Sequence, residues 1–368
     1  MPRKNVEEKP PTRAVPDAAD LTTQVSAALG RAVAAIEKIE AGLGARRFYR
    51  VLLTGDDAPR SVVARVDAPE DPRLRPKGVP PEPPLEPVRA LLESAGLPVP
   101  ACLHRAEGWM LLEDVGDTSL EVASSGLPGA EVESLYREAC ELVPRLQAVG
   151  PAPEVANFER QLDAALFSYK AEQVVEWTLP WAGLRRPEAA GEDAAVREGF
   201  AAIAEIAADA PQRLSHRDFK AANLHLHPRN EAGTRLVMID LQGAFLAPPE
   251  YDLVCLLRDS HVELAEPFVT RLLESVRPRL PDAPSLEAFA LRFDLLTLTR
   301  NGKDLSRYLY AAKTRGDDRY LALVPRAVRT LRDAAERCTS VSPAIDRLAE
   351  VFLSLPLPPP LPEDRCEQ

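Results

Sequence analysis

A short polar motif in the second half of the chain carries side chains suited to phosphoryl transfer. Residues 216–223 read His-Arg-Asp-Phe-Lys-Ala-Ala-Asn, and seventeen positions after Asn223 an apolar run ends in Asp240. Phosphoryl transfer from ATP requires a base or orienting group for the attacking hydroxyl and two oxygen ligands for Mg²⁺. The order of these residues predicts Asp218 as the base and Asn223 and Asp240 as the metal ligands.

The sequence after this motif predicts a hairpin that delivers the second metal ligand. Residues 224–227 alternate as a half-buried strand does, residues 228–234 favour a turn, and residues 235–239 form a second strand. The base and the first ligand then share one rigid loop. Asp240 arrives from the end of the neighbouring strand, as in-line attack on a metal-bound phosphate requires.

Each residue of this region also has a structural alternative. Asp218 could be an ordinary turn residue, and Lys220, which could offset charge on the transferred phosphate, could simply face solvent. His216 is expected to hydrogen-bond within the loop rather than to move protons. His225 and His227 lie on one face of the predicted strand, but no further His or Cys stands nearby, so a zinc site is disfavoured.

The composition limits the class of protein. A chain of 368 residues, 45% of them hydrophobic, can bury one large or two medium cores. A net charge of −11 without a basic block disfavours a nucleic-acid partner. Five scattered cysteines without a CxxC pair favour a reducing cytoplasm, and no apolar stretch is long enough to span a membrane. The sequence does not predict the oligomeric state.

The first third of the chain predicts a small, mostly β lobe over residues 21–116. Apolar residues from Leu21 to Ile39 fall at helical spacing and predict a helix. A glycine-bearing, cationic segment over residues 42–50, which includes Arg46, could then lie over phosphates. The pattern beyond it predicts strands over residues 51–53, 61–66 and 109–113 and a helix over residues 88–95.

A second cation of this lobe could contact the α- and β-phosphates of ATP. Arg65 is the only cation in the strand that ends at residue 66, and an arginine can bind phosphate through two parallel donors. The choice of its acidic partner between Glu86 and Glu93 stays open. Glu113 is expected to offer only backbone groups to an adenine.

Residues 117–352 are chiefly helical and should form a larger lobe that holds the catalytic loop and the acceptor. Helical spacing covers residues 131–149, 158–178 and 194–208. Trp177, Arg300 and Lys303 could line an acceptor pocket, although packing for the tryptophan and a solvated face for the two cations are equally good explanations. Asp252 opens an apolar helix and is expected to cap it, and it could also brace the catalytic loop.

The ends of the chain have a different composition. Residues 1–20 mix charge with proline, and residues 353–368 are proline-dense and then acidic. Neither segment can repay its ordering entropy by burial, so both are expected to be flexible tails. The chain as a whole therefore predicts an α+β fold with a small antiparallel β lobe and a larger, mainly helical lobe.

These motifs resemble the aminoglycoside phosphotransferase and choline kinase-like superfamily, and within it a branch of bacterial N-acetylmuramate/N-acetylglucosamine anomeric kinases. The resemblance is carried by residues 44–50, 67–70, 111–117, 216–223 and 239–244, and is extended by residues 251–259 and 300–321. It implies a protein kinase-like fold of two lobes that uses ATP and Mg²⁺. The branch commonly has an acidic residue where Gly243 stands here, and residues 220–222 also depart from its usual polar filling.

The resemblance implies transfer of the γ-phosphate to the anomeric hydroxyl of an N-acetylated amino sugar, in cell-wall recycling. The two departures affect the acceptor rather than the ATP chemistry. Phosphorylation of an aminoglycoside or another alcohol is therefore an alternative. A catalytically silent scaffold that binds nucleotide or a partner protein is a further alternative, which the intact set of Asp218, Asn223 and Asp240 disfavours.

Overall fold

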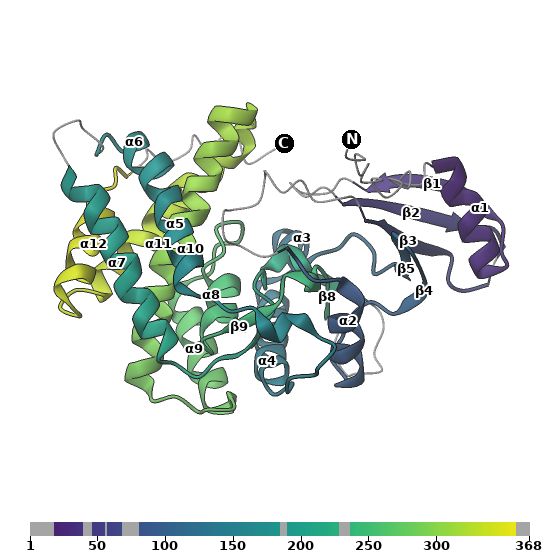
Figure 1. Cartoon of the computed structure of the whole chain (residues 1–368), viewed down its shortest axis with the longest axis horizontal. Coiled ribbons are helices and arrows are strands. Elements are labelled where there is room, and N and C mark those ends of the chain that lie inside the picture. The colour runs from purple at the N-terminus through teal and green to yellow at the C-terminus, as the bar shows by residue number, and fades with distance from the viewer. Residues whose placement is uncertain are drawn as a thin grey trace, which may run out of the picture. The chain divides into compact units, whose positions relative to one another are not determined.

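The structure is a computed structural model that describes residues 18–39, 46–55, 57–67, 81–184, 190–227 and 236–357. The chain divides into two compact units, one formed by Met1–Leu74 and Pro100–Asp114 and the other by Arg75–Val99 and Val115–Gln368. The predicted glycine-bearing segment before Arg46, the turn after residue 227 and most of both predicted tails lie outside the described residues. The expected division into a small β lobe and a larger helical lobe is confirmed (Figure 1).

The smaller unit is an antiparallel sheet with one helix on it. Its elements are α1 (Ala18–Leu29), β1 (Val33–Ile39), β2 (Arg47–Leu53), β3 (Ser61–Val66), β4 (Cys102–Ala106) and β5 (Trp109–Glu113). The strand order is β1-β2-β3-β5-β4. Leu21 and Val25 of α1 are fully buried against Val51, Val62 and Leu111 of the sheet. This apolar face, which α1 covers in Figure 1, is the core that stabilises the unit.

The single helix predicted from Leu21 to Ile39 is wrong in its second half. Gly30 has φ +63° and ends α1, as a left-handed glycine after a helix does. Val33–Ile39 then pairs with β2 as an edge strand, with Ile36 opposite Val51. Three β-branched residues at every third position fit a helix pattern, but pairing with an available sheet edge decides the outcome. At its amino-terminal end α1 extends to Ala18, into the segment expected to be a tail.

The larger unit consists of helices and two short pairs of strands. Its helices are α2 (Leu85–Ser94), α3 (Leu120–Gly126), α4 (Gly129–Gln147), α5 (Ala164–Gln173), α6 (Leu179–Trp181), α7 (Ala190–Ala208), α8 (Tyr251–Leu257), α9 (Glu266–Val276), α10 (Leu286–Arg315), α11 (Val324–Arg337) and α12 (Pro343–Leu353). Short helical turns are η1 (Ala156–Glu159), η2 (Val174–Thr178), η3 (Ala221–Asn223), η4 (Leu241–Gly243), η5 (Arg277–Arg279) and η6 (Asp318–Leu323). Its strands are β6 (Arg213–Ser215), β7 (Leu224–Leu226), β8 (Leu236–Met238) and β9 (Phe245–Ala247).

The strands of this unit form two hairpin-like pairs around the catalytic motif. β7 pairs with β8, with Leu224 opposite Met238, and β6 pairs with β9. The predicted hairpin after the motif is therefore present, with strands over residues 224–226 and 236–238. The motif itself lies between β6 and β7, so both of its ends are fixed by sheet hydrogen bonds.

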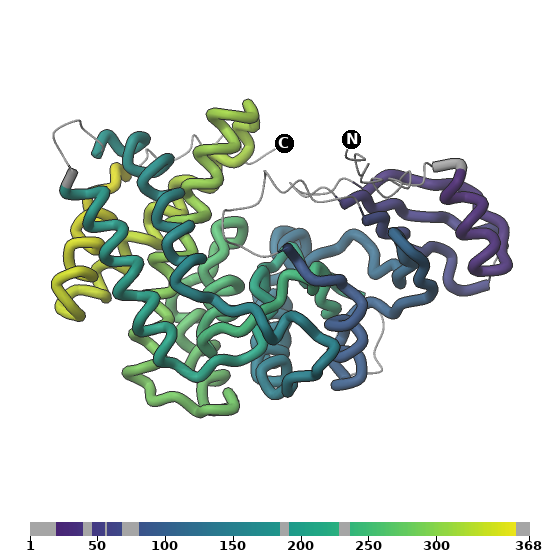
Figure 2. The backbone as a smooth tube through the Cα atoms, viewed as in Figure 1, coloured from purple at the N-terminus to yellow at the C-terminus, as the bar shows by residue number. Residues whose placement is uncertain are grey.

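The helices pack around α10, the longest of the described helices. Ser285 caps its amino-terminal end by accepting a hydrogen bond from the Ala288 amide, and Gly316 ends it with φ +67°. α7 and α12 lie side by side (Figure 2), although the first residue of α12 comes 135 positions after the last residue of α7. A Cβ on Gly199 of α7 would lie 2.5 Å from the Leu348 Cβ, so the close contact of these two helices requires glycine.

Helix α2 belongs to the larger unit, although the sequence placed it in the lobe that ends at residue 116. Leu85, Val88 and Leu92 are buried, and α2 packs against η4. The Met238 amide also donates to the carbonyl of Pro98, just beyond the helix. Local sequence order predicts lobe membership poorly here because packing of one apolar helix face decides it.

The expected carboxy-terminal tail begins later than residue 353, since Leu355 is fully buried. No helix within the described ranges is long and apolar enough to cross a membrane.

Candidate active site

A buried carboxylate fixes the backbone of the catalytic loop. Asp252, in the first turn of α8, accepts hydrogen bonds from Ser215 Oγ at 2.7 Å, from the His216 amide at 2.7 Å and from the Arg217 amide at 3.1 Å. Arg217 has φ +78°, a conformation that is strained for a residue with a side chain. These three charge-assisted bonds hold the loop in that conformation. Asp252 is thus a brace for the loop, and the helix cap expected for it is wrong because Glu250 occupies the capping position.

The loop is also tied to the strand that carries the second predicted metal ligand. A ring nitrogen of His216 lies 2.8 Å from the Ile239 carbonyl oxygen, and the Ile239 amide donates to the Asn223 carbonyl at 3.0 Å. His216 is buried. Its structural role was expected from the sequence, but its partner, Ile239, directly follows β8 and does not belong to the loop.

Asp218 forms an ion pair with Arg300, which the sequence assigned to an acceptor pocket or a solvated face. Nη1 of Arg300 lies 3.1 Å from Asp218 Oδ1, and its Nε lies 2.9 Å from Asp304 Oδ2. The arginine is 7% exposed, whereas the Asp218 side chain is 37% exposed. The carboxylate can therefore contact a bound molecule while the arginine holds it from behind.

The charges around Asp218 keep it ionised. Burial raises its pKa, but the nearby cations Arg300, Arg217, Lys303 and Lys220 outweigh that effect and hold the pKa well below the usual range. A carboxylate this acidic is a hydrogen-bond acceptor that orients a hydroxyl rather than a strong base. The proximity of Lys220 to Asp218 agrees with a role near the reacting phosphate, and its side chain is half-buried rather than fully solvated.

Asn223 and Asp240 supply the donor set that Mg²⁺ prefers. The Asn223 side chain is buried and donates through Nδ2 to the Asp218 carbonyl at 2.8 Å, which leaves its Oδ1 as the atom able to ligate a cation. Asp240 is exposed and has φ +65°. It directly follows Ile239, whose amide donates to the Asn223 carbonyl. Gln242 Nε2 donates to its Oδ1. Two hard oxygen donors plus phosphate oxygens fit Mg²⁺.

The zinc alternative has no support. His225 bonds through Nδ1 to the Gly116 carbonyl at 2.9 Å. Across the part of the chain that the structure describes, no three His, Cys, Asp or Glu side chains gather as a metal site would require.

The departure at Gly243 has a structural counterpart. A Cβ at this position would lie 3.3 Å from Nη1 of Arg217 and 3.7 Å from a Glu82 carboxylate oxygen. Glu82 pairs with that same nitrogen at 3.0 Å. Glu82, which precedes α2, thus faces Arg217 close to Gly243, the position where the related branch commonly carries an acidic residue. Because Gly243 has no side chain, there is room for Glu82 at this place.

The residues predicted to meet the nucleotide lie in the smaller unit. Arg65 is buried on β3, and its Nη2 lies 2.9 Å from Asp67 Oδ1. Glu113 ends β5 and accepts a hydrogen bond from the Ala101 amide, while Arg46 is half-buried directly before β2. A second arginine of this sheet, Arg50, pairs with Asp114 at 2.7 Å.

The two acidic residues considered as partners of Arg65 have another partner. Glu86 and Glu93 flank Arg89 on α2 and lie 2.7 Å and 3.0 Å from its guanidinium nitrogens. Spacing of three and four residues on a helix brings these side chains together. Within the smaller unit Arg65 thus pairs with Asp67, and within the larger unit Arg89 pairs with both glutamates.

Trp177 lines a pocket that does not include the ion pair of Asp218. It packs edge-on against Tyr310 at 5.0 Å between ring centroids and lines a pocket of about 390 Å³ with Trp181, Leu309 and Lys313. Leu309, the first residue of α10 that lines this pocket, comes six positions after Lys303, which is about 9 Å along the helix axis. Arg300 and Lys303 therefore gather at Asp218, whereas Trp177 does not.

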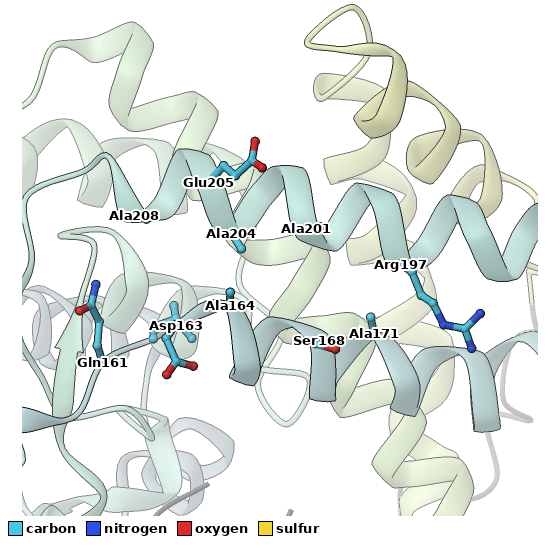
Figure 3. A pocket seen from close by; sticks show the side chains of 11 residues that line it. Gln161, Asp163, Ala164, Ser168, Ala171, Arg197, Ala201, Ala204, Glu205 and Ala208 are labelled. Atoms are coloured by element: carbon cyan, nitrogen blue, oxygen red, sulfur yellow. The ribbon is translucent and has the colours of Figure 1, made fainter. Parts of the chain in front are cut away.

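A second hollow lies between α5 and α7 (Figure 3). It measures about 400 Å³ and is lined largely by alanines, with Gln161 and Asp163 toward one end and Arg197 toward the other. Asp163 caps α5, and Arg197 pairs with Glu172. Its lining residues lack a nucleophile, a general base and metal ligands in one cluster, so this hollow is not the candidate active site.

The sequence profile of the phosphotransferase enzyme family matches residues 35–289, which include the whole catalytic motif and both predicted metal ligands. The chain belongs to this family. It is therefore an ATP-dependent phosphotransferase, and the predicted resemblance is confirmed.

Individual relatives agree with this assignment. The N-acetylmuramate/N-acetylglucosamine kinase of Pseudomonas aeruginosa is 29% identical over 278 residues, which cover 73% of this chain and 77% of the relative. A choline kinase of Streptococcus pneumoniae has a TM-score of 0.56 at 16% identity, over 85% of this chain and 98% of the other. An ADP-bound aminoglycoside phosphotransferase has a TM-score of 0.55 at 15% identity, over 91% and 99%. The two solved structures confirm the protein kinase-like fold.

Sequence reasoning missed several residues that build the site. Ser215 and Glu82 contact the catalytic loop, and Asn157 donates to the carbonyls of Gln242 and Ala244 in the segment after Asp240. Asp304 was also missed. Its position four residues after Arg300 on a predicted helix was the one available signal.

Proposed function

We propose that this phosphotransferase phosphorylates an N-acetylated amino sugar, N-acetylmuramate or N-acetylglucosamine, at its anomeric C1 hydroxyl, in cell-wall recycling. The observation that carries the proposal is the ionised, partly exposed Asp218 held by Arg300 on a braced loop. The choice of sugar rests on the P. aeruginosa relative, whose name gives these two substrates.

In this proposal Asp218 accepts the hydrogen bond of the attacking hydroxyl and aims its oxygen at the γ-phosphorus. A bond forms between that oxygen and phosphorus, the bond from phosphorus to the β,γ-bridging oxygen breaks, and ADP leaves. The hydroxyl proton passes toward the Asp218 carboxylate as the bond to phosphorus forms, and then to solvent. Since Arg300 keeps this carboxylate weakly basic, positioning contributes more than proton abstraction does.

Asn223 Oδ1 and the Asp240 carboxylate are proposed to hold Mg²⁺. When bound, the ion neutralises charge on the β- and γ-phosphate oxygens. Lys220 is proposed to offset charge on the transferred group. Arg46 and Arg65 are proposed to contact phosphates, and backbone groups at Glu113 to contact the adenine.

The acceptor is tested by measuring ADP release with a panel of N-acetylmuramate, N-acetylglucosamine, glucosamine, choline and aminoglycosides. We expect turnover of the N-acetyl sugars. The product should be a sugar phosphate that mild acid hydrolyses, because a phosphate on the anomeric carbon is labile to acid. Turnover of only an aminoglycoside or choline would replace the sugar assignment. ATP binding without turnover of any acceptor would favour a silent scaffold.

The role of Asp218 is tested with the D218A variant. We expect kcat to fall by roughly a hundredfold or more, with ATP affinity within about twofold of wild type because the carboxylate contacts the acceptor rather than the nucleotide. The exposed Asp209 gives the matched control, since D209A removes an aspartate in the same unit but away from the loop. Equal losses of kcat and ATP affinity in D218A would refute the assigned role.

A further inference from the structure

A buried lysine near the catalytic loop has no carboxylate of its own. Lys170 of α5 is 6% exposed. Its Nζ lies 3.5 Å from the Tyr251 hydroxyl and over the rings of Phe167 and Tyr251, at 5.3 Å and 5.1 Å from their centroids. Within the described residues no acidic side chain forms an ion pair with it. Buried cations are rare without such a partner, so this position needs an explanation.

The packing of two helices places Lys170 near the part of α10 that carries Arg300. The continuous helix formed by α5 and η2 runs along α10, with Val174 against Gly302 and Thr178 hydrogen-bonded to Ser306 at 2.8 Å. A Cβ on Gly302 would lie 3.2 Å from the Val174 side chain, so glycine allows this close approach. One turn before Val174, Lys170 lies at the level of residues just before Arg300.

The group around Asp218 carries more positive than negative charge. Lys170, Arg300 and Lys303 influence one another electrostatically. Asp304 acts on all three, and Asp218 acts on Arg300 and Lys303. Arg217, which pairs with Glu82, and Lys220 also act on Asp218, so the cations outnumber the carboxylates. Burial, together with the charges of the other cations, lowers the pKa of Lys170 to about 7 and that of Lys303 to about 8. A bound anion would offset part of this excess of positive charge.

These residues differ in their exposure to solvent. The Asp218 side chain is 37% exposed, that of Lys303 is 12% exposed, and Lys170 is 6% exposed. Asp218 is thus the residue of this group that a bound molecule can reach most easily, and Lys303, whose Nζ pairs with Asp304 Oδ1 at 2.5 Å, is the more accessible of the two lysines. Lysine has three donors on a flexible stem and can turn them toward an entering anion.

We propose that Lys170 and Lys303 bind a carboxylate of the acceptor, so that the enzyme prefers an acidic amino sugar to its neutral counterpart. This inference rests on the proposed function and adds a specificity site to it. N-acetylmuramate carries a lactyl carboxylate that N-acetylglucosamine lacks, so the two sugars differ in the group that these lysines would recognise. The transferred phosphate is the competing anion for the same cations, and it is common to both sugars.

The test compares kcat/KM for the two sugars in the full-length wild-type enzyme and in the K170M and K303M variants. We expect the preference for N-acetylmuramate over N-acetylglucosamine to fall by about tenfold or more in each variant, as loss of a hydrogen bond to a charged group predicts. The exposed Lys38 gives the matched control, and K38M should leave the preference unchanged. Thermal unfolding of each variant checks that it is folded, and K170Q and K303Q provide second substitutions.

The outcomes separate this inference from the proposed function. An equal loss with both sugars would assign the lysines to the phosphate and overturn the inference, while the sugar kinase assignment would stand. An unchanged preference in all four variants would also overturn it. If the wild-type enzyme turns over neither sugar, both proposals fail together.

Discussion

Replacement of Lys170 by methionine should make this protein more stable. Burial, with the nearby charges of Lys303 and Arg300, lowers the pKa of Lys170 from 10.5 to about 7. Each tenfold loss of proton affinity corresponds to about 1.4 kcal/mol. At pH 7 the lysine therefore destabilises the folded state by roughly 4 kcal/mol relative to a neutral side chain. Methionine has a similar length and flexibility and no charge to desolvate.

The effect should depend on pH with a defined sign. Between about pH 7 and pH 10.5 the unfolded chain keeps the proton on Lys170 while the folded chain loses it. The free energy of unfolding of the wild-type protein therefore rises as the pH rises through that window, because the cost of burying a charged Lys170 becomes smaller. The difference in free energy of unfolding between K170M and wild type should decrease by about 2 kcal/mol between pH 6 and pH 8.5.

Urea denaturation followed by tryptophan fluorescence measures this difference, and the chain contains three tryptophans. The range stops at pH 8.5 because burial raises the pKa of Cys140 and Cys255 to about 12. Those thiols ionise first in the unfolded chain, so they lower stability at higher pH. K38M serves as the control. A K170M protein that is less stable than wild type at pH 7, or a stability difference that does not change with pH, would refute the reasoning.

Three further predictions concern the loop and the helix packing. R300Q should lower kcat by about tenfold or more and move the acidic limb of the kcat/KM profile to higher pH, because Asp218 loses the cation that depresses its pKa. D252N should destabilise the protein by about 2–4 kcal/mol in urea denaturation, since the amide cannot accept all three loop hydrogen bonds; a change under 1 kcal/mol would contradict the bracing role. G199A should destabilise it by about 1–3 kcal/mol through contact with Leu348, with KM values unchanged in steady-state assays.

The local part of the site could be predicted because its residues are close in the sequence. Asp218 and Asn223 share one loop, and the hairpin that follows carries Asp240 to the strand end. Strand alternation and turn composition act over a few residues, so the sequence alone predicts these elements well. The same reasoning failed at Val33–Ile39, where the helical spacing was real but a free edge of the sheet was available for pairing.

The partners of the catalytic loop could not be predicted, because they come from distant segments. Asp252, Arg300 and Glu82 reach the loop from three different helices or their flanks. The helical position of Arg300 gave equal reason to expect a solvated side chain. Only the packing of α10 against the loop places this arginine behind Asp218.

The amino-acid sequence by itself determined which polar side chains the loop and hairpin carry, since Asp218, Asn223 and Asp240 and their order belong to short segments of the chain. The tertiary structure decided the electrostatics of that chemistry. Whether a lysine such as Lys170 is a solvated cation or a buried one depends on how far water is excluded by helices that are far apart in the sequence. Spacing along one segment does not contain that information.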